Sequence, residues 1–284
     1  IRIFRSDKRS FRQKTMKKIL ITCVNYNTYD YLIRFIDSIE NSLLHCNIQN
    51  LQVEIHIADH STQKQKVDFS KYKDINIILY PLDNLGYLGG AATIINHIDD
   101  ITQYDFVAIS NVDLAIDKFF FSSLLEQKLP DETGWIAPSI YSKLEKRDKN
   151  PKILNRYSLK RIKMLQIMYK YPIVNKIYLA TLYKRKKIQA TIPAGKTIYA
   201  GHGSFILLTK KFFSNYRQLK YPIFLFGEEI YFAELMQKQN LKVLYIPSIK
   251  IWDIEHTSTG SIKKRTYYRY NHEAITYIRK TFYE

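Results

Sequence analysis

The chain has 284 residues and a formal net charge of +18, from 44 Lys and Arg against 26 Asp and Glu. A hydrophobic content of 46%, with 23 Tyr and 15 Phe, excludes a disordered chain, and 9 Gly and 8 Pro are too few for low-complexity linkers. Two cysteines, Cys23 and Cys46, exclude a disulfide framework and favour a reducing compartment.

Targeting and anchoring signals are not visible in the sequence. The apolar runs are well short of the roughly 18 residues that a membrane-spanning helix needs, and no secretory signal is recognisable. We expect Met16 to be the natural start and residues 1–15 to be an N-terminal extension that is not native.

The first half of the chain alternates between strand and helix patterns. The pattern of a strand, an amphipathic helix and further buried strands predicts a parallel sheet with helices on both faces. In chain order the elements are strand 17–27, helix 28–44, strand 51–61, strand 75–81, helix 91–98 and a strand that ends at 111–113.

The second half departs from this rhythm. A strand at 134–141 is followed by a basic segment, 143–190, and strand character resumes over 196–213. A helix is predicted over 228–240 and a strand over 241–254, in which Pro247 indicates a sheet edge or a bulge.

The positive charge is concentrated in three segments. Residues 1–18 hold 8 basic and 1 acidic residue, residues 143–190 hold 15 and 2, and residues 261–284 hold 6 and 2. A mildly acidic core therefore carries three basic attachments, a distribution typical of binding to nucleic acid or to an anionic membrane.

Polar clusters follow three of the predicted strands: 25–27, 59–61 and 111–113. Parallel strands end at the same edge of a sheet, so these clusters are expected to converge, although a single carboxylate such as Asp113 is also an ordinary strand end. Nearby, Gly86, Gly89 and Gly90 precede a helix, where free backbone N–H groups suit a phosphate or a sugar. Their spacing matches neither a P-loop nor a dinucleotide fingerprint.

The second half adds two further candidates. Glu228 and Glu229 begin a helix beside apolar residues, where paired carboxylates can tune one of them towards a general base. The alternative is that Glu228 only favours the helix N-terminus through the dipole. His256 could complete an oxygen-plus-imidazole site for Mn²⁺ or Mg²⁺ with Asp113, or be structural.

The ordered set of these motifs resembles family 2 glycosyltransferases of the GT-A fold. It comprises "CVNYNTYDYLIRFIDSI", "IADHST", "NLGYLGGAATIINHI", "YDFVAISNVDL", "YAGHGSFILLTKKFF" and "FLFGEEIYFAELMQKQNLKVLYIPSIKIWDIEHTSTG". The resemblance covers roughly 17–260 and is greatest to rhamnosyltransferase-like bacterial enzymes of surface polysaccharide synthesis, such as capsule or O-antigen. It implies one domain over 16–260, with 143–190 as a basic helical insertion and 261–284 as a basic C-terminal helical tail.

The resemblance also implies a role for each matching residue. Glu229 would be the general base, with Glu228 as the competing candidate, and Asp113 and His256 would be the metal ligands. Asn111 stands in place of the first carboxylate of the family's D-x-D motif. The nucleotide-sugar site would comprise Asn25, Tyr26, Asp59, Gly86, Gly89, Gly90, Asn111, Asp113, Gly201, His202, Gly203 and Ser204.

The implied reaction is an inverting, metal-dependent transfer of a sugar from a dTDP- or UDP-sugar to a hydroxyl of a saccharide. Mn²⁺ or Mg²⁺ would stabilise the leaving diphosphate, and a carboxylate would activate the acceptor alcohol.

The segment 151–189 lies outside the minimal resemblance. Leu159, Ile162, Leu165, Met168 and Tyr169 recur at helical spacing, and lysines occupy much of the remaining surface. We expect an amphipathic helix that lies on the anionic cytoplasmic face of the cell membrane, where a lipid-linked acceptor would be found. The alternative is an ordinary helical hairpin packed on the core. The tail could extend this surface or form a homodimer contact.

Two other classes of protein compete with this interpretation. A basic nucleic-acid-binding protein would account for the charge but not for the strand-end cluster, the glycine turn or Glu229, so no nucleic-acid partner is expected. A sugar nucleotidyltransferase would carry a glycine-rich, basic loop after the first strand, where this chain has "NYNTYDY".

Overall fold

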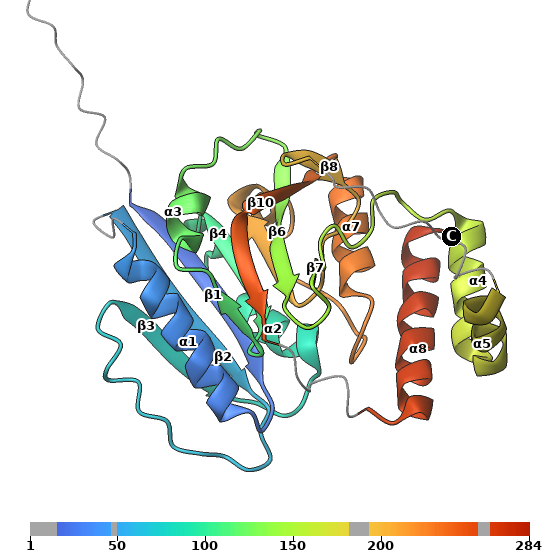
Figure 1. The fold of residues 1–284 in the computed structure, drawn as a ribbon, viewed down its shortest axis with the longest axis horizontal. Coiled ribbons are helices and arrows are strands. Elements are labelled where there is room, and N and C mark those ends of the chain that lie inside the picture. The colour runs from blue at the N-terminus through green and yellow to red at the C-terminus, as the bar shows by residue number, and fades with distance from the viewer. Residues whose placement is uncertain (1–15, 47–49, 182–192, 255–261) are drawn as a thin grey trace, which may run out of the picture.

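The computed structural model describes residues 16–46, 50–181, 193–254 and 262–284. They form an α/β structure in which helices flank a large central sheet (Figure 1). Within these ranges, no helix is long and apolar enough to cross a bilayer.

The strands are β1 (Lys17–Asn25), β2 (Leu51–Asp59), β3 (Ile75–Pro81), β4 (Phe106–Asn111), β5 (Leu114–Ile116), β6 (Thr133–Ser142), β7 (Arg147–Asp148), β8 (Lys196–Ile198), β9 (Phe205–Thr209) and β10 (Lys242–Asp253). The helices are α1 (Tyr29–Leu44), α2 (Tyr87–Asn96), α3 (Phe120–Leu125), α4 (Leu159–Lys170), α5 (Pro172–Thr181), α6 (Lys210–Asn215), α7 (Glu228–Lys238) and α8 (Lys264–Phe282), with a short 3-10 helix at Ile101–Gln103.

The sheet is mixed but mainly parallel, in the order β3-β2-β1-β4-β9-β6-β10-β5. β1 runs parallel to β2 and β4, and β3 runs parallel to β2. The direction reverses at β9, which is antiparallel to both β4 and β6, whereas β10 is parallel to β6. The predicted parallel sheet with flanking helices is thus confirmed at this level.

The alternation of apolar residues explains why both faces are covered. Along β1, Ile19 and Ile21 pack on one face with α1 and α3, whereas Leu20 packs on the other with α2 and α7. In α1 the predicted apolar stripe of Leu32, Phe35, Ile36, Ile39 and Leu43 is buried throughout. Because β1 is buried on both faces, its strand end is held rigidly where it meets the candidate site.

One predicted strand, 196–213, is wrong as a single element. It is divided into β8, a loop, β9 and α6. The chain turns at Gly201, where a Cβ atom would lie 2.9 Å from the side chains of Trp135 and Ala137. Pro247 lies, as predicted, at a bulge, because the register of β10 against β6 shifts between Ile246 and Lys250.

The basic segment forms α4 and α5, which stand with α8 at the end of the molecule away from α1 (Figure 1). Most of the stripe predicted to face a membrane instead packs inward: Ile162 and Met168 are buried, and Leu165 and Tyr169 pack on the core, whereas Leu159 at the start of the helix is exposed. The predicted orientation of this stripe was wrong, because α8 packs over it. Binding of the segment to a membrane stays a prediction. The helical hairpin packed on the core was the better description of this helix.

Candidate active site

A large cavity of about 1160 Å³ opens at the carboxyl ends of β1 and β4. Its walls also include the start of α2, the loop before β9, the start of α7, and one side each of α4 and α8. Of the residues predicted from sequence, the lining includes Tyr26, Gly86, Asn111, Asp113, His202, Gly203, Ser204, Glu228 and Glu229. Residues far apart in the chain therefore share one space, as expected for strand ends in such a sheet.

Asn25 and Asp59 are not among the lining residues. The Asn25 amide donates to Asp59 Oδ1 at 3.0 Å, and Tyr29 Oη and Ser61 Oγ donate to the same carboxylate at 2.7 and 2.6 Å. Asp59 is 1% exposed. Burial raises its pKa, but the hydrogen bonds from Ser61, Tyr29 and Asn25 outweigh burial and leave the pKa below its usual value. In this structure the two residues join the ends of β1 and β2 behind the cavity wall.

The glycine-rich turn contributes through close backbone approach. Gly86 has φ +76°, and a Cβ atom there would lie 1.8 Å from the carbonyl oxygen of Phe224. Gly90 is packed against the His60 ring, and Gly89 and Gly90 do not line the cavity. The turn thus allows the segment before α7 to lie directly against the start of α2.

Tyr87 ties three parts of the site together, and sequence reasoning missed it. Its hydroxyl lies 3.2 Å from the Ile109 carbonyl oxygen and 2.9 Å from that of Gly203. Burial raises its pKa well above the usual value, and the charges of Glu228 and Asp113 add to this. The sequence signal that could have identified Tyr87 is its position among Gly86, Gly89 and Gly90, because a large aromatic side chain in a glycine-rich turn can reach across the strand ends.

The corner between β4 and β5 carries Asn111 and Asp113. The Asn111 N–H donates to the Ser204 carbonyl at 2.9 Å, and the Ile254 N–H donates to the Asp113 carbonyl at 3.3 Å. These bonds join the corner to the loop before β9 and to the end of β10. Asp253, at the end of β10, also lines the cavity.

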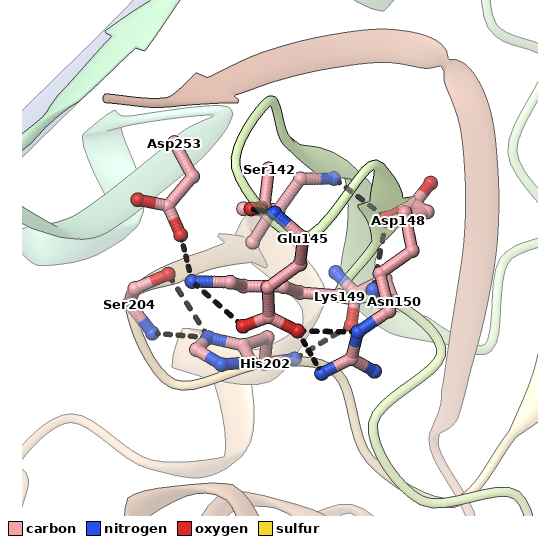
Figure 2. A network of polar contacts seen from close by, with 10 residues as sticks. Ser142, Glu145, Asp148, Lys149, Asn150, His202, Ser204 and Asp253 are labelled. Carbon is pink, nitrogen blue, oxygen red and sulfur yellow. Dashed lines mark hydrogen bonds and ion pairs between the residues drawn. The ribbon is translucent and has the colours of Figure 1, made fainter. Parts of the chain in front are cut away.

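A network of polar contacts includes residues that line the cavity (Figure 2), namely Lys149, His202, Ser204 and Asp253. Lys149 lies between Asp253 and Glu145 and forms an ion pair with each. Asn150 Oδ1 accepts from the His202 N–H at 2.7 Å. Lys149 and Lys152 both line the cavity, so the basic segment brings positive charge into it. The sequence pattern did not single out these contacts, two of which join residues 52 and 104 positions apart.

His202 is held in a neutral form. Burial of the ring lowers its pKa well below the usual value, and the nearby charges of Lys152, Lys149 and Arg147 lower it further. The Ser204 N–H donates to His202 Nδ1 at 3.2 Å. Nδ1 is therefore an acceptor, and the ring proton of the neutral tautomer resides on Nε2.

The two carboxylates at the start of α7 differ in their surroundings. The chain enters the helix through Phe226 and Gly227, with φ +72° and +86°. Glu228 is buried, and this burial, together with repulsion from Glu229, raises its pKa to about 8, although backbone N–H groups oppose the shift. Glu229 Oε1 accepts a hydrogen bond from the Gly203 N–H at 3.3 Å. At neutral pH, Glu228 is thus mainly protonated and is not available to accept a proton.

This difference predicts a pH-dependent stability. The folded state keeps the Glu228 proton up to about pH 8, whereas the unfolded chain loses it near pH 4.5. The protonated Glu228 therefore contributes its whole stabilising free energy below pH 4.5, and this contribution is lost as the pH rises to 8. We expect the melting temperature of Glu228→Gln, relative to the unmodified chain, to rise between pH 5 and pH 8. A constant difference in melting temperature across this range would contradict the assignment.

The far side of this cavity is aromatic. Tyr157, Tyr169, Tyr267, Tyr270 and Phe224 all line it. The Phe224 and Tyr270 rings lie 5.2 Å apart between centroids. Such rings present flat apolar faces with polar edges, which suit a ligand with both C–H and O–H groups.

The residues present supply few protein ligands for a metal ion. Among the described ranges, no group of three or more His, Cys, Asp or Glu side chains is placed to hold one. Asp113 remains as a carboxylate beside the neutral amide of Asn111, and His256 lies outside the described residues. A divalent cation would therefore fit only with oxygens from a bound ligand completing its shell.

The chain matches no protein-family model, and no curated protein is significantly similar to it. The cavity geometry is therefore the basis for a functional assignment.

Proposed function

We propose that the chain is an inverting glycosyltransferase with a GT-A fold, using a nucleotide-diphosphate sugar as donor and a lipid-linked saccharide as acceptor. The observation that carries this proposal is the shared cavity: the Asn111–Asp113 corner, the Gly86 turn and Glu229 all line it. The raised pKa of Glu228 and the ionisable Glu229 give the cavity the paired carboxylates of acid–base chemistry.

The proposed donor half lies at the strand ends. Tyr26, Gly86 and the Asn111–Asp113 corner would contact the nucleotide and its diphosphate, with Lys152 offsetting its negative charge. The neutral His202 can donate from Nε2 to a phosphate or sugar oxygen. A divalent ion, Mn²⁺ or Mg²⁺, bound through Asp113 and the phosphates would supply further charge stabilisation when present.

The proposed reaction is a single displacement. The acceptor hydroxyl oxygen attacks the anomeric carbon while its proton passes to the Glu229 carboxylate. The bond between the anomeric carbon and the phosphate oxygen breaks, and the nucleoside diphosphate leaves with the electron pair. Attack opposite the leaving group inverts the anomeric configuration, and no covalent enzyme intermediate is needed.

The donor half is tested by thermal shift with UDP-, dTDP- and GDP-sugars, each with and without Mn²⁺. At a donor concentration about 100 times Kd, binding adds about 2.7 kcal/mol, so one donor class should raise the melting temperature by about 5 °C or more in a chain of this size. Asp113→Ala should remove the Mn²⁺-dependent part of the shift. Asp99→Ala, an exposed site outside the cavity, is the matched control.

The same panel separates the competing classes of protein. Stabilisation by oligonucleotides alone would replace the transferase proposal with nucleic-acid binding. Stabilisation by nucleoside triphosphates, but by no nucleotide sugar, would instead favour a nucleotidyltransferase.

A further inference from the structure

The structure leaves an apolar and basic surface on the outer side of α4 and α5, which we call the α4–α5 face. Its apolar members are Ile167, Tyr171, Ile173 and Val174. Ile173 is 72% exposed and Ile167 is 50% exposed. Large aliphatic side chains with this much exposure, grouped on two adjacent helices, are unusual unless the surface binds something.

Contacts on the inner side fix the direction in which this face points. The Asn175 amide donates to Tyr268 Oη at 2.8 Å, which ties α5 to α8. Arg161 of α4 lies over the Tyr178 ring of α5 at 5.3 Å. Because these residues face α4 and α8, the face of α5 that carries Ile173 is directed outward.

Lysines surround the exposed apolar side chains. Lys163, Ile167 and Lys170 recur at i, i+4 and i+7, so they share one side of α4, and all three are exposed. Lys176 is exposed on α5. The sequence from 149 to 227 contains no Asp or Glu, so positive charge on this face is not balanced by neighbours in the same segment.

We propose that the α4–α5 face docks on an anionic phospholipid membrane, with the aliphatic side chains in the interface and the lysines on lipid headgroups. A second copy of this chain fits poorly, because pairing the face with itself would place lysines against lysines. Nucleic acid would satisfy the lysines but would leave Ile167 and Ile173 without an apolar environment. An anionic bilayer satisfies both groups.

Helix α4 connects the docking face to the cavity, because different sides of the same helix belong to each. Leu165 and Tyr169 of α4 line the cavity, whereas Ile167 and Lys170 of the same helix lie on the docking face. Docking would therefore hold the aromatic side of the cavity beside the membrane surface, where a lipid-linked ligand is presented. The docking itself goes beyond the proposed function, and binding to vesicles can be measured without any donor or acceptor.

The test is co-sedimentation with vesicles of phosphatidylcholine that contain about one third phosphatidylglycerol, compared with pure phosphatidylcholine. We expect binding to the anionic vesicles that weakens as salt rises from about 0.1 M to about 1 M, because the screening length falls from about 10 Å to about 3 Å. Lys163→Glu with Lys170→Glu should lower the partition coefficient at least about tenfold. Ile167→Asp with Ile173→Asp should do the same at low salt.

Matched controls are available elsewhere on the surface. Leu44 and Leu144 are 75% and 74% exposed, so Leu44→Asp with Leu144→Asp tests whether any added surface charge weakens binding. Lys64→Glu with Lys66→Glu, in the exposed β2–β3 loop, tests net charge alone. Both controls should bind vesicles as the unmodified chain does, and all variants should keep the unmodified melting temperature within a few degrees.

Three outcomes would overturn the proposal. The first is absence of binding to anionic vesicles at low salt. The second is an equal loss in the control variants, which would assign any binding to overall charge. The third is a dimer in light scattering that Ile167→Asp with Ile173→Asp converts to a monomer, without vesicle binding, which would make the face a contact between copies.

Discussion

Glu229→Gln is expected to lower the rate of sugar transfer by about 10²- to 10⁴-fold while leaving the affinity for the donor unchanged. The amide has nearly the same shape and can still accept the hydrogen bond from the Gly203 N–H, but it cannot take a proton from the acceptor hydroxyl. The rate is measured as release of nucleoside diphosphate from the stabilising donor, with a membrane lipid extract as acceptor. Donor affinity is measured separately by calorimetry.

Glu228→Gln provides the matched comparison. Glu228 has a pKa of about 8 and is already mainly neutral at pH 7, so an amide there should change the rate much less. If Glu228→Gln proved the more damaging substitution, the base would be Glu228 instead. Equal, small effects of both substitutions would contradict general-base catalysis by either residue.

Gly86→Ala is expected to destabilise the fold by about 3 kcal/mol or more, the size of a severe steric change. Two effects combine there: φ is +76°, and the new Cβ atom would meet the Phe224 carbonyl oxygen at 1.8 Å. The first effect costs about 1–3 kcal/mol for a residue with a Cβ atom, because φ +76° with ψ −177° is essentially restricted to glycine. The second forces the segment before α7 away from α2, and so widens the cavity.

Gly195→Ala separates the two effects. Gly195 has φ +73°, close to that of Gly86, but no atom lies within 4 Å of a Cβ atom built there. It should therefore show only the cost of the left-handed conformation. Both substitutions are measured by urea unfolding, and equal losses at the two sites would show that the close approach to Phe224 contributes nothing.

The sequence predicted the first half of the fold well because its signals are local. The apolar stripe of α1 and the continuous apolar run of β1 each specify an element buried by its immediate neighbours. The strand ends could be placed at one edge because parallel strands share a direction. This reasoning put Tyr26, Asn111 and Asp113 in one place, and the structure shows all three lining the cavity.

The features that were missed depend on contacts between distant segments. No local pattern indicates that Lys149 pairs with Asp253, or that Tyr87 reaches Gly203. The stripe of α4 has the spacing of a membrane-facing helix, and only the presence of α8 decides that it is buried. The exposed Ile173 was not part of that stripe, so the docking face emerged from packing and not from periodicity.

Asp59 illustrates how burial changes a prediction from resemblance. A carboxylate at the end of β2 is expected to contact the donor, yet its oxygens accept bonds from Asn25, Tyr29 and Ser61. Its contact with a nucleotide stays a prediction. As placed, Asp59 supports the site by holding the ends of β1 and β2 together.

The bond of the nucleotide sugar that breaks distinguishes a glycosyltransferase from a nucleotidyltransferase most directly. Phosphorus NMR of the stabilising nucleotide sugar, incubated with the protein, Mn²⁺ and a membrane lipid extract, identifies the phosphorus products. A glycosyltransferase should yield a nucleoside diphosphate, together with a transferred sugar of inverted anomeric configuration. A sugar 1-phosphate with a nucleoside triphosphate, formed when pyrophosphate is added, would contradict the proposed function, as would a donor that remains intact at every protein concentration.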